Sequence, residues 1–158
     1  MSKKDSTQVY KIILFAVAAL GFLALAFTAY KYVISNSTTS YSFADFLGHI
    51  GKDGAVGASG RNTAYTFFEW TSLIALICLG ANAALALISF ILEGLSVKAM
   101  KVFSIVGTLL TLVALICGYV YLSGINPLVG NYALGFAPWF MLIVSALHTV
   151  VLFYAFRR

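Results

Sequence analysis

Four long apolar segments constrain the fold of this chain more than any other feature. They run from about residue 12 to 34, 71 to 92, 102 to 122 and 137 to 156, and Lys31 is the only charged residue within them. An α-helix needs about 20 mostly apolar residues to cross a bilayer. The whole chain is 61% hydrophobic and 9% charged, whereas soluble domains are about 45–50% apolar and about 25% charged. We therefore predict an all-α membrane protein whose residues 1–158 form one four-span (tetraspan) domain.

The connection between the second and third spans is short. Residues 93–101 separate the two apolar segments, and connections of this length favour antiparallel neighbours in an up-down four-helix bundle. The first span has an alternative interpretation, because lysines followed by an apolar run are also typical of a secretory signal peptide. Ala24-Leu25-Ala26 is an acceptable cleavage site, but the apolar run continues past it, which favours an uncleaved span.

The distribution of lysine and arginine predicts the orientation. The N-terminal tail, residues 93–101 and the C-terminus hold seven of these residues, and the other side holds three. Cytoplasmic loops carry an excess of Lys and Arg. We therefore expect both termini on the cytoplasmic side of the cell (plasma) membrane, and the small size suggests a bacterial cytoplasmic membrane.

Residues 35–70 form the only sizeable polar segment and would lie outside the cell. Residues 37–43 and 63–68 are rich in β-branched and aromatic types, which predicts a short β-hairpin between them. The alternative is a short helix over residues 43–50, capped by Ser42, with its apolar face resting on the membrane interface.

Polar side chains within the spans are the candidate functional residues. Asn82, Thr111 and His148 lie near the centres of the second, third and fourth spans, so they should share one depth. They can act as a polar clasp that joins helices. Alternatively, they line a path for a substrate or proton, since histidine titrates near neutral pH.

The sequence contains no recognisable catalytic or metal-binding constellation. Cys78 and Cys117 lie in apolar runs, and His49 and His148 are on different segments. We predict no enzyme activity, no cofactor and no metal. Nucleic acid is not an expected partner either, because the net charge of +5 comes from residues at span ends and not from one basic face.

These observations predict a non-catalytic scaffold, or an accessory or assembly subunit, of a membrane complex. Its partners would be the lipid bilayer and another membrane protein or further copies of itself. The alternative is a small oligomeric transporter or channel with a polar path lined by Asn82, Thr111 and His148. A dry, packed environment around His148 favours the first function, and a continuous cavity favours the second.

Overall fold

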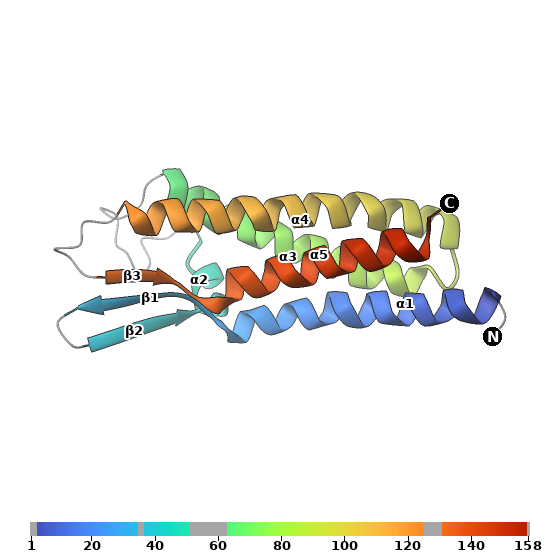
Figure 1. The fold of residues 1–158 in the computed structure, drawn as a ribbon, viewed down its shortest axis with the longest axis horizontal. Helices are drawn as coiled ribbons and strands as arrows, with labels where there is room; N and C mark the ends of the chain where they lie inside the picture. The colour runs from blue at the N-terminus through green and yellow to red at the C-terminus, as the bar shows by residue number, and fades with distance from the viewer. Residues whose placement is uncertain (1–2, 35–36, 51–62, 125–130, 158) are drawn as a thin grey trace.

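Long helices that lie side by side form most of the molecule (Figure 1). The computed structural model describes residues 3–34, 37–50, 63–124 and 131–157. The long helices are α1 (Lys3–Leu20), α3 (Thr63–Ile88), α4 (Glu93–Ser123) and α5 (Phe136–Ala155). A 3₁₀ helix, η1 (Gly21–Ala26), continues α1. Within the described ranges, four helical segments are long and apolar enough to cross a membrane.

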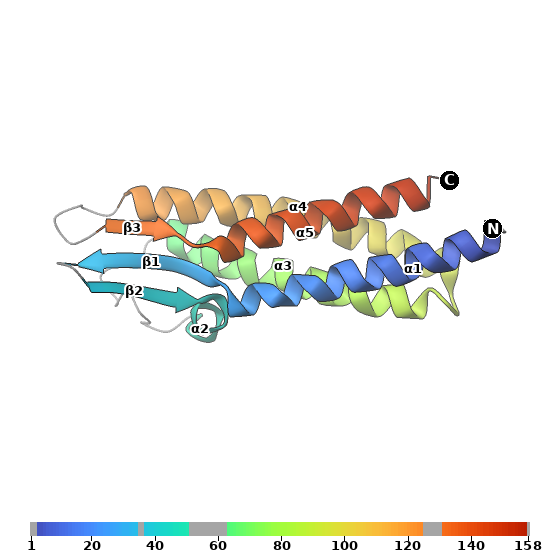
Figure 2. The same cartoon turned by 60° about the horizontal axis from the view of Figure 1, so that its bottom comes forward.

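The helices pack so that α1 and α4 each contact both α3 and α5. Both chain ends and the α3–α4 connection lie at one end of the molecule, and a small sheet lies at the other (Figures 1 and 2). The predicted connection over residues 93–101 is wrong, because these residues form the first turns of α4. The turn between the helices is shorter and is closed by hydrogen bonds such as Leu92 N to Ile88 O at 2.9 Å.

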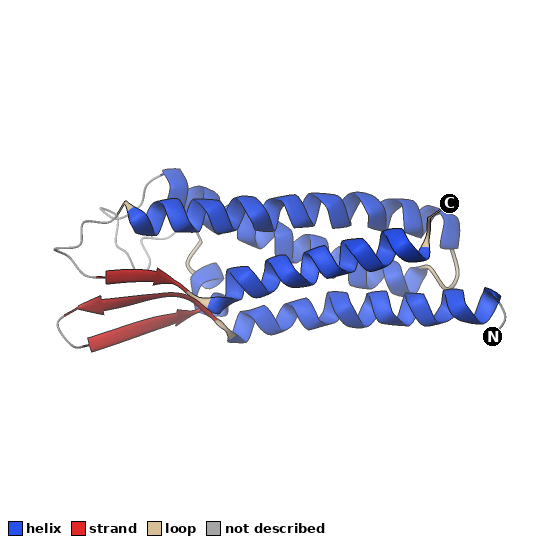
Figure 3. Ribbon diagram, viewed as in Figure 1, coloured by secondary structure: helices blue, strands red, loops and turns tan. Residues whose placement is uncertain are grey.

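A three-stranded antiparallel sheet lies beside the helices (Figure 3), and one of its strands replaces the expected end of the first span. The strands are β1 (Thr28–Ile34), β2 (Ser37–Ser42) and β3 (Asn131–Leu134), in the order β2-β1-β3. Lys31 of β1 pairs with Ser40 on one side and with Ala133 on the other. The prediction of a helix to residue 34 is therefore wrong. Residues 28–34 are rich in β-branched and aromatic types, which suit a strand once partners are available.

The short helix predicted after Ser42 is present as α2 (Phe43–Gly48). The Ser42 hydroxyl accepts a hydrogen bond from the Asp45 backbone N–H at 3.1 Å, which is a typical N-cap. Its apolar face does not rest on a membrane interface, because Phe43 and Phe46 are buried in the protein core. The predicted hairpin between residues 37–43 and 63–68 is also wrong, since β2 pairs with β1 and α3 begins at Thr63.

Buried aromatic rings join the sheet to the helices. Phe46 of α2 is central, with its ring centroid 6.1 Å from Tyr30, 6.0 Å from Tyr65 and 4.6 Å from Phe68. Tyr65 in turn lies 4.8 Å from Tyr121 of α4. Burial raises the pKa of Tyr30 far above its usual value, and the neighbouring tyrosines add to the effect, so its hydroxyl stays neutral. We call these five side chains the aromatic junction.

Two lysines tie helices together at the opposite end. Lys11 of α1 donates to the carbonyl of Ser89, just past the end of α3, at 2.8 Å. Lys101 of α4 donates to the carbonyl of Phe156, at the end of α5, at 2.7 Å. The last carbonyls of a helix lack partners within the helix and carry partial negative charge, so an ammonium group stabilises them.

The close approach of β1 to the start of α5 depends on Gly135. Its N–H donates to the carbonyl of Ala29 at 2.8 Å, and a Cβ atom at this position would overlap the carbonyl group of Thr28. We expect Gly135→Ala to destabilise the protein by about 1–3 kcal/mol, as overpacking does. The measurement is thermal unfolding in lipid nanodiscs, followed by circular dichroism.

Gly94→Ala is the matched control for this substitution. Among the described residues, no atom beyond the chain neighbours and local helix backbone lies within 4 Å of a Cβ built on Gly94, and alanine favours a helix over glycine. This variant should therefore unfold at the wild-type temperature or above it. Equal stability of the Gly135→Ala variant and the wild type would contradict the close packing described here.

Candidate functional site

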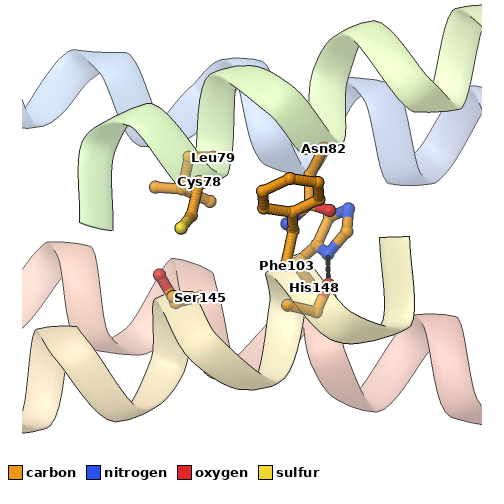
Figure 4. A pocket seen from close by; sticks show the side chains of 8 residues that line it. Cys78, Leu79, Asn82, Phe103, Ser145 and His148 are labelled. Carbon is orange, nitrogen blue, oxygen red and sulfur yellow. Dashed lines mark hydrogen bonds between the residues drawn. The ribbon is translucent and has the colours of Figure 1, made fainter. Parts of the chain in front are cut away.

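A group of buried polar side chains lies between α3, α4 and α5 (Figure 4). We call Asn82, Ser104, Ser145 and His148 the polar cluster. Their exposed fractions are 2%, 2%, 3% and 0%. Helical spacing explains this burial, because each residue continues a stripe of buried positions at intervals of three or four residues. On α4 the stripe is Val97, Met100, Ser104, Gly107, Thr111, Ala114, Gly118 and Tyr121.

Hydrogen bonds within the cluster join α4 to α5. The Ser104 hydroxyl lies 2.8 Å from Nδ1 of His148. One turn further along, the hydroxyl groups of Thr108 and Thr149 are 2.9 Å apart, and that of Thr149 also lies 3.2 Å from the carbonyl oxygen of Ser104. Bonds of this kind between membrane helices contribute about 0.6 kcal/mol on average. Together they fix the register of α4 against α5.

Three buried atoms of the cluster have no hydrogen-bond partner among the described residues. They are Oδ1 of Asn82, Oγ of Ser145 and Nε2 of His148. Figure 4 shows the Asn82 side chain directed toward the His148 ring. When the Ser104 hydroxyl donates to Nδ1, Nε2 carries the ring proton and becomes a donor, and Oδ1 of Asn82 is an acceptor. The cluster therefore places a hydrogen-bond donor, Nε2 of His148, on α5 and a hydrogen-bond acceptor, Oδ1 of Asn82, on the facing helix α3.

The space between these side chains is small. Cys78, Leu79, Phe103 and Gly107 complete its lining, and it has no room for a water molecule. A buried water needs about 10–15 Å³ and several polar partners. The centre of the bundle at His148 is therefore dry and packed.

Thr111 lies apart from the other two predicted site residues. It lines a second small cavity of about 10 Å³, together with Ser72, Ala114 and Met141. Its hydroxyl donates to the carbonyl of Thr108 in its own helix at 2.8 Å. The structure thus brings Asn82 and His148 to one cavity and leaves Thr111 at another, nearer the sheet.

Ser104 is the cluster residue that the sequence analysis did not single out. It lies seven residues before Thr111, two steps along the buried stripe of α4, so helical spacing counted back from Thr111 would have found it. Glu69 was also missed. It lies just before the predicted second span, yet it is 0% exposed on α3, on the same face as Tyr65 and Phe68.

Metal-ligating side chains do not gather in the part of the chain that the structure describes. No group of three His, Cys, Asp or Glu residues is close enough to hold a metal ion there, and Cys78 and Cys117 are free thiols. No family model, curated protein or solved structure matches the chain. Functional inference therefore starts from the helices and the polar cluster themselves.

A double-mutant cycle tests the contact between Ser104 and His148. Ser104→Ala leaves Nδ1 of His148 without its partner, and we expect a loss of about 1–3 kcal/mol in unfolding free energy. In combination with His148→Leu, the coupling energy should be about 1 kcal/mol. Reversible unfolding in mixed detergent micelles measures both values.

The control cycle combines Ser123→Ala with His148→Leu. Ser123 lies on the same helix, but its hydroxyl donates to the carbonyl of Val120 at the exposed end of α4. Distant sites are additive, so the coupling energy should be close to zero. A Ser104–His148 coupling as small as this control would rule out the contact as a link between α4 and α5.

Proposed function

We propose that this protein is a non-catalytic, four-span protein of the cell membrane that serves as a scaffold, or as an accessory or assembly subunit, of a membrane complex. In this proposal the four long helices form an up-down bundle across the bilayer. Both termini and the α3–α4 turn face the cytoplasm, and the sheet stands outside. Another membrane protein or further copies of the chain would complete the complex.

Exposed side chains along the helices support membrane insertion. Ile77, Leu109, Ile143 and Val150 are 58%, 57%, 58% and 65% exposed, and large apolar groups on a helix surface suit lipid rather than water. On α3, the 20 residues from Glu69 to Ile88 rise by about 30 Å, which is the thickness of the hydrocarbon core.

Charges support the orientation. Lys11 binds the Ser89 carbonyl just past the end of α3, and Lys98 and Lys101 lie on the first turns of α4. The α3–α4 turn lies at the same end of the molecule as the two termini (Figure 1). An excess of Lys and Arg marks the cytoplasmic side. In the sheet at the opposite end, Lys31 is the only charged residue among the described positions, and this low charge fits an extracytoplasmic location.

The observation that carries the proposed function is the dry polar cluster. Ser104 bonds to His148 beside Asn82, where no water fits, which supports contacts between helices rather than an open path. A bundle held in this way can serve as a stable support. In this proposal, its outer surfaces make the contacts with the partner protein or with further copies of the chain.

A transporter or channel remains the alternative, and one observation favours it. The unpartnered atoms of Asn82, Ser145 and His148 face one cavity at the centre of the bundle. Separation of α3 from α5 would expose these atoms to water. Thr111 would then join the path from its neighbouring cavity.

The size of the native complex tests the scaffold proposal. We expect the tagged protein, extracted from its own membrane in polymer-bounded lipid discs, to be larger than one chain. A second protein in fixed stoichiometry, or several copies of this chain, should account for the mass. Mass photometry and mass spectrometry make the measurement. A monomer alone in such discs would contradict the proposal.

A flux assay separates the two functions. In liposomes with a proton gradient, we expect the purified protein to leak no faster than protein-free liposomes, because the centre of the bundle is dry. The variants His148→Ala and Ser123→Ala should behave in the same way. Proton flux that His148→Ala abolishes and Ser123→Ala preserves would favour the transporter and contradict the scaffold.

A further inference from the structure

The turn between α3 and α4 displays a group of apolar side chains that the fold does not cover. Phe90, Ile91, Leu92 and Leu95 are 46%, 85%, 57% and 74% exposed. We call these four residues the inner turn. Ile91 and Leu92 lie between the two candidate spans, which end at Ile88 and begin again at Gly94, so the lipid that surrounds the helices does not by itself explain their exposure.

The backbone of the inner turn is hydrogen-bonded within the turn. Phe90 N donates to Leu87 O at 3.2 Å, Ile91 N to Ile88 O at 2.9 Å, and Ser96 N to Leu92 O at 3.2 Å. Backbone groups with internal partners can leave water at little cost. These backbone N–H groups of the turn therefore have hydrogen-bond partners, which suits an apolar environment.

Positive charges lie at the level where α3 ends. The Lys11 ammonium group binds the Ser89 carbonyl at 2.8 Å and lies 5.4 Å from the centre of the Phe90 ring. Lys98 is exposed on the first turns of α4. The N-terminal tail, residues 93–101 and the C-terminus carry seven Lys and Arg residues against Asp5 and Glu93.

An exposed apolar surface leads from the spans onto the turn. Leu87 and Ile88 at the end of α3 are 52% and 44% exposed, and Val102 on α4 is 61% exposed. Polar headgroups add about 10–15 Å to the 30 Å hydrocarbon core of a bilayer. The turn begins at the depth in the bilayer where Lys11 lies and extends into this headgroup layer. Apolar and cationic side chains in this layer bind anionic lipid.

We propose that the inner turn inserts into the cytoplasmic leaflet and that Lys98 beside it binds the phosphate of anionic phospholipids. The proposal rests on the four-span membrane orientation described above. The turn then acts as a wedge that sets the depth of α3 and α4 in the bilayer and enriches anionic lipid around this end of the protein.

Tryptophan fluorescence tests the insertion. Trp70→Phe and Trp139→Phe remove the native tryptophans, and Ile91→Trp adds one reporter to the turn. In vesicles of phosphatidylcholine and phosphatidylglycerol, we expect quenching by lipids brominated near the headgroup and protection from aqueous iodide. Ser40→Trp on the exposed sheet is the aqueous control, and Ile143→Trp on α5 is the control within the bilayer.

The controls separate failure of the wedge from failure of the membrane proposal. Iodide quenching of Ile91→Trp equal to that of Ser40→Trp, with Ile143→Trp still quenched by brominated lipid, would overturn the wedge alone. Iodide quenching at all three positions would overturn membrane insertion itself. A disulfide between two copies of an Ile91→Cys variant in vesicles would show that the turn packs against a second copy, which also overturns the wedge.

Lipid retention tests the headgroup contact. Native mass spectrometry of the protein, released from vesicles with equal amounts of the two lipids, should show preferential retention of phosphatidylglycerol. Lys98→Gln should reduce this preference by up to about fivefold, the effect of one cation near an anionic surface. Lys31→Gln on the sheet should leave it unchanged. Equal retention of both lipids by the wild type, or equal effects of the two variants, would overturn the proposed role of Lys98.

Discussion

The buried stripe of α4 is the contact on which the rest of the structure depends. The small residues of this stripe let α3 approach closely. A Cβ atom added to Gly107 would lie 3.1 Å from the Cβ atom of Cys78, and one added to Gly118 would lie 3.2 Å from the ring of Phe68. Close backbone approach is the main source of packing between apolar helices in lipid. The same stripe carries Val97 and Met100 at one end of the core, Ser104 at the polar cluster and Tyr121 at the aromatic junction, so one helix face connects both ends.

The two ends of the bundle are closed by different interactions. At one end, aromatic rings from the sheet, α2, α3 and α4 fill the space with apolar contacts. At the other, lysine ammonium groups bind the last carbonyls of α3 and α5. Between the two ends, the polar cluster adds directional hydrogen bonds. These bonds set the position of α4 along α5, which apolar packing alone would fix only weakly. This division supports a structural role for His148, since its ring is held within a packed core and has no open access to solvent.

In the proposed scaffold, the surfaces that bind partners lie outside the core. The sheet and the inner turn stand at opposite ends of the molecule (Figure 2), and they differ in chemistry. The described part of the sheet presents hydroxyl groups and Lys31, while the turn presents large apolar side chains next to lysines. If the protein is the scaffold that we propose, one end would contact lipid headgroups and the other would contact a protein.

The sequence alone determined the four apolar helices, the N-cap at Ser42 and the inward position of Asn82 and His148, because hydrophobic length, capping residues and helical spacing are local patterns. Tertiary structure decided where the first helix ends. Thr28 to Ile34 form a strand that pairs with β2, which follows directly in the chain, and with β3, about 100 residues later. Local propensity cannot show such pairing partners. Tertiary structure also decided that His148 bonds to Ser104 and that Thr111 lies in another cavity, since the relative rotation of packed helices depends on all their contacts together.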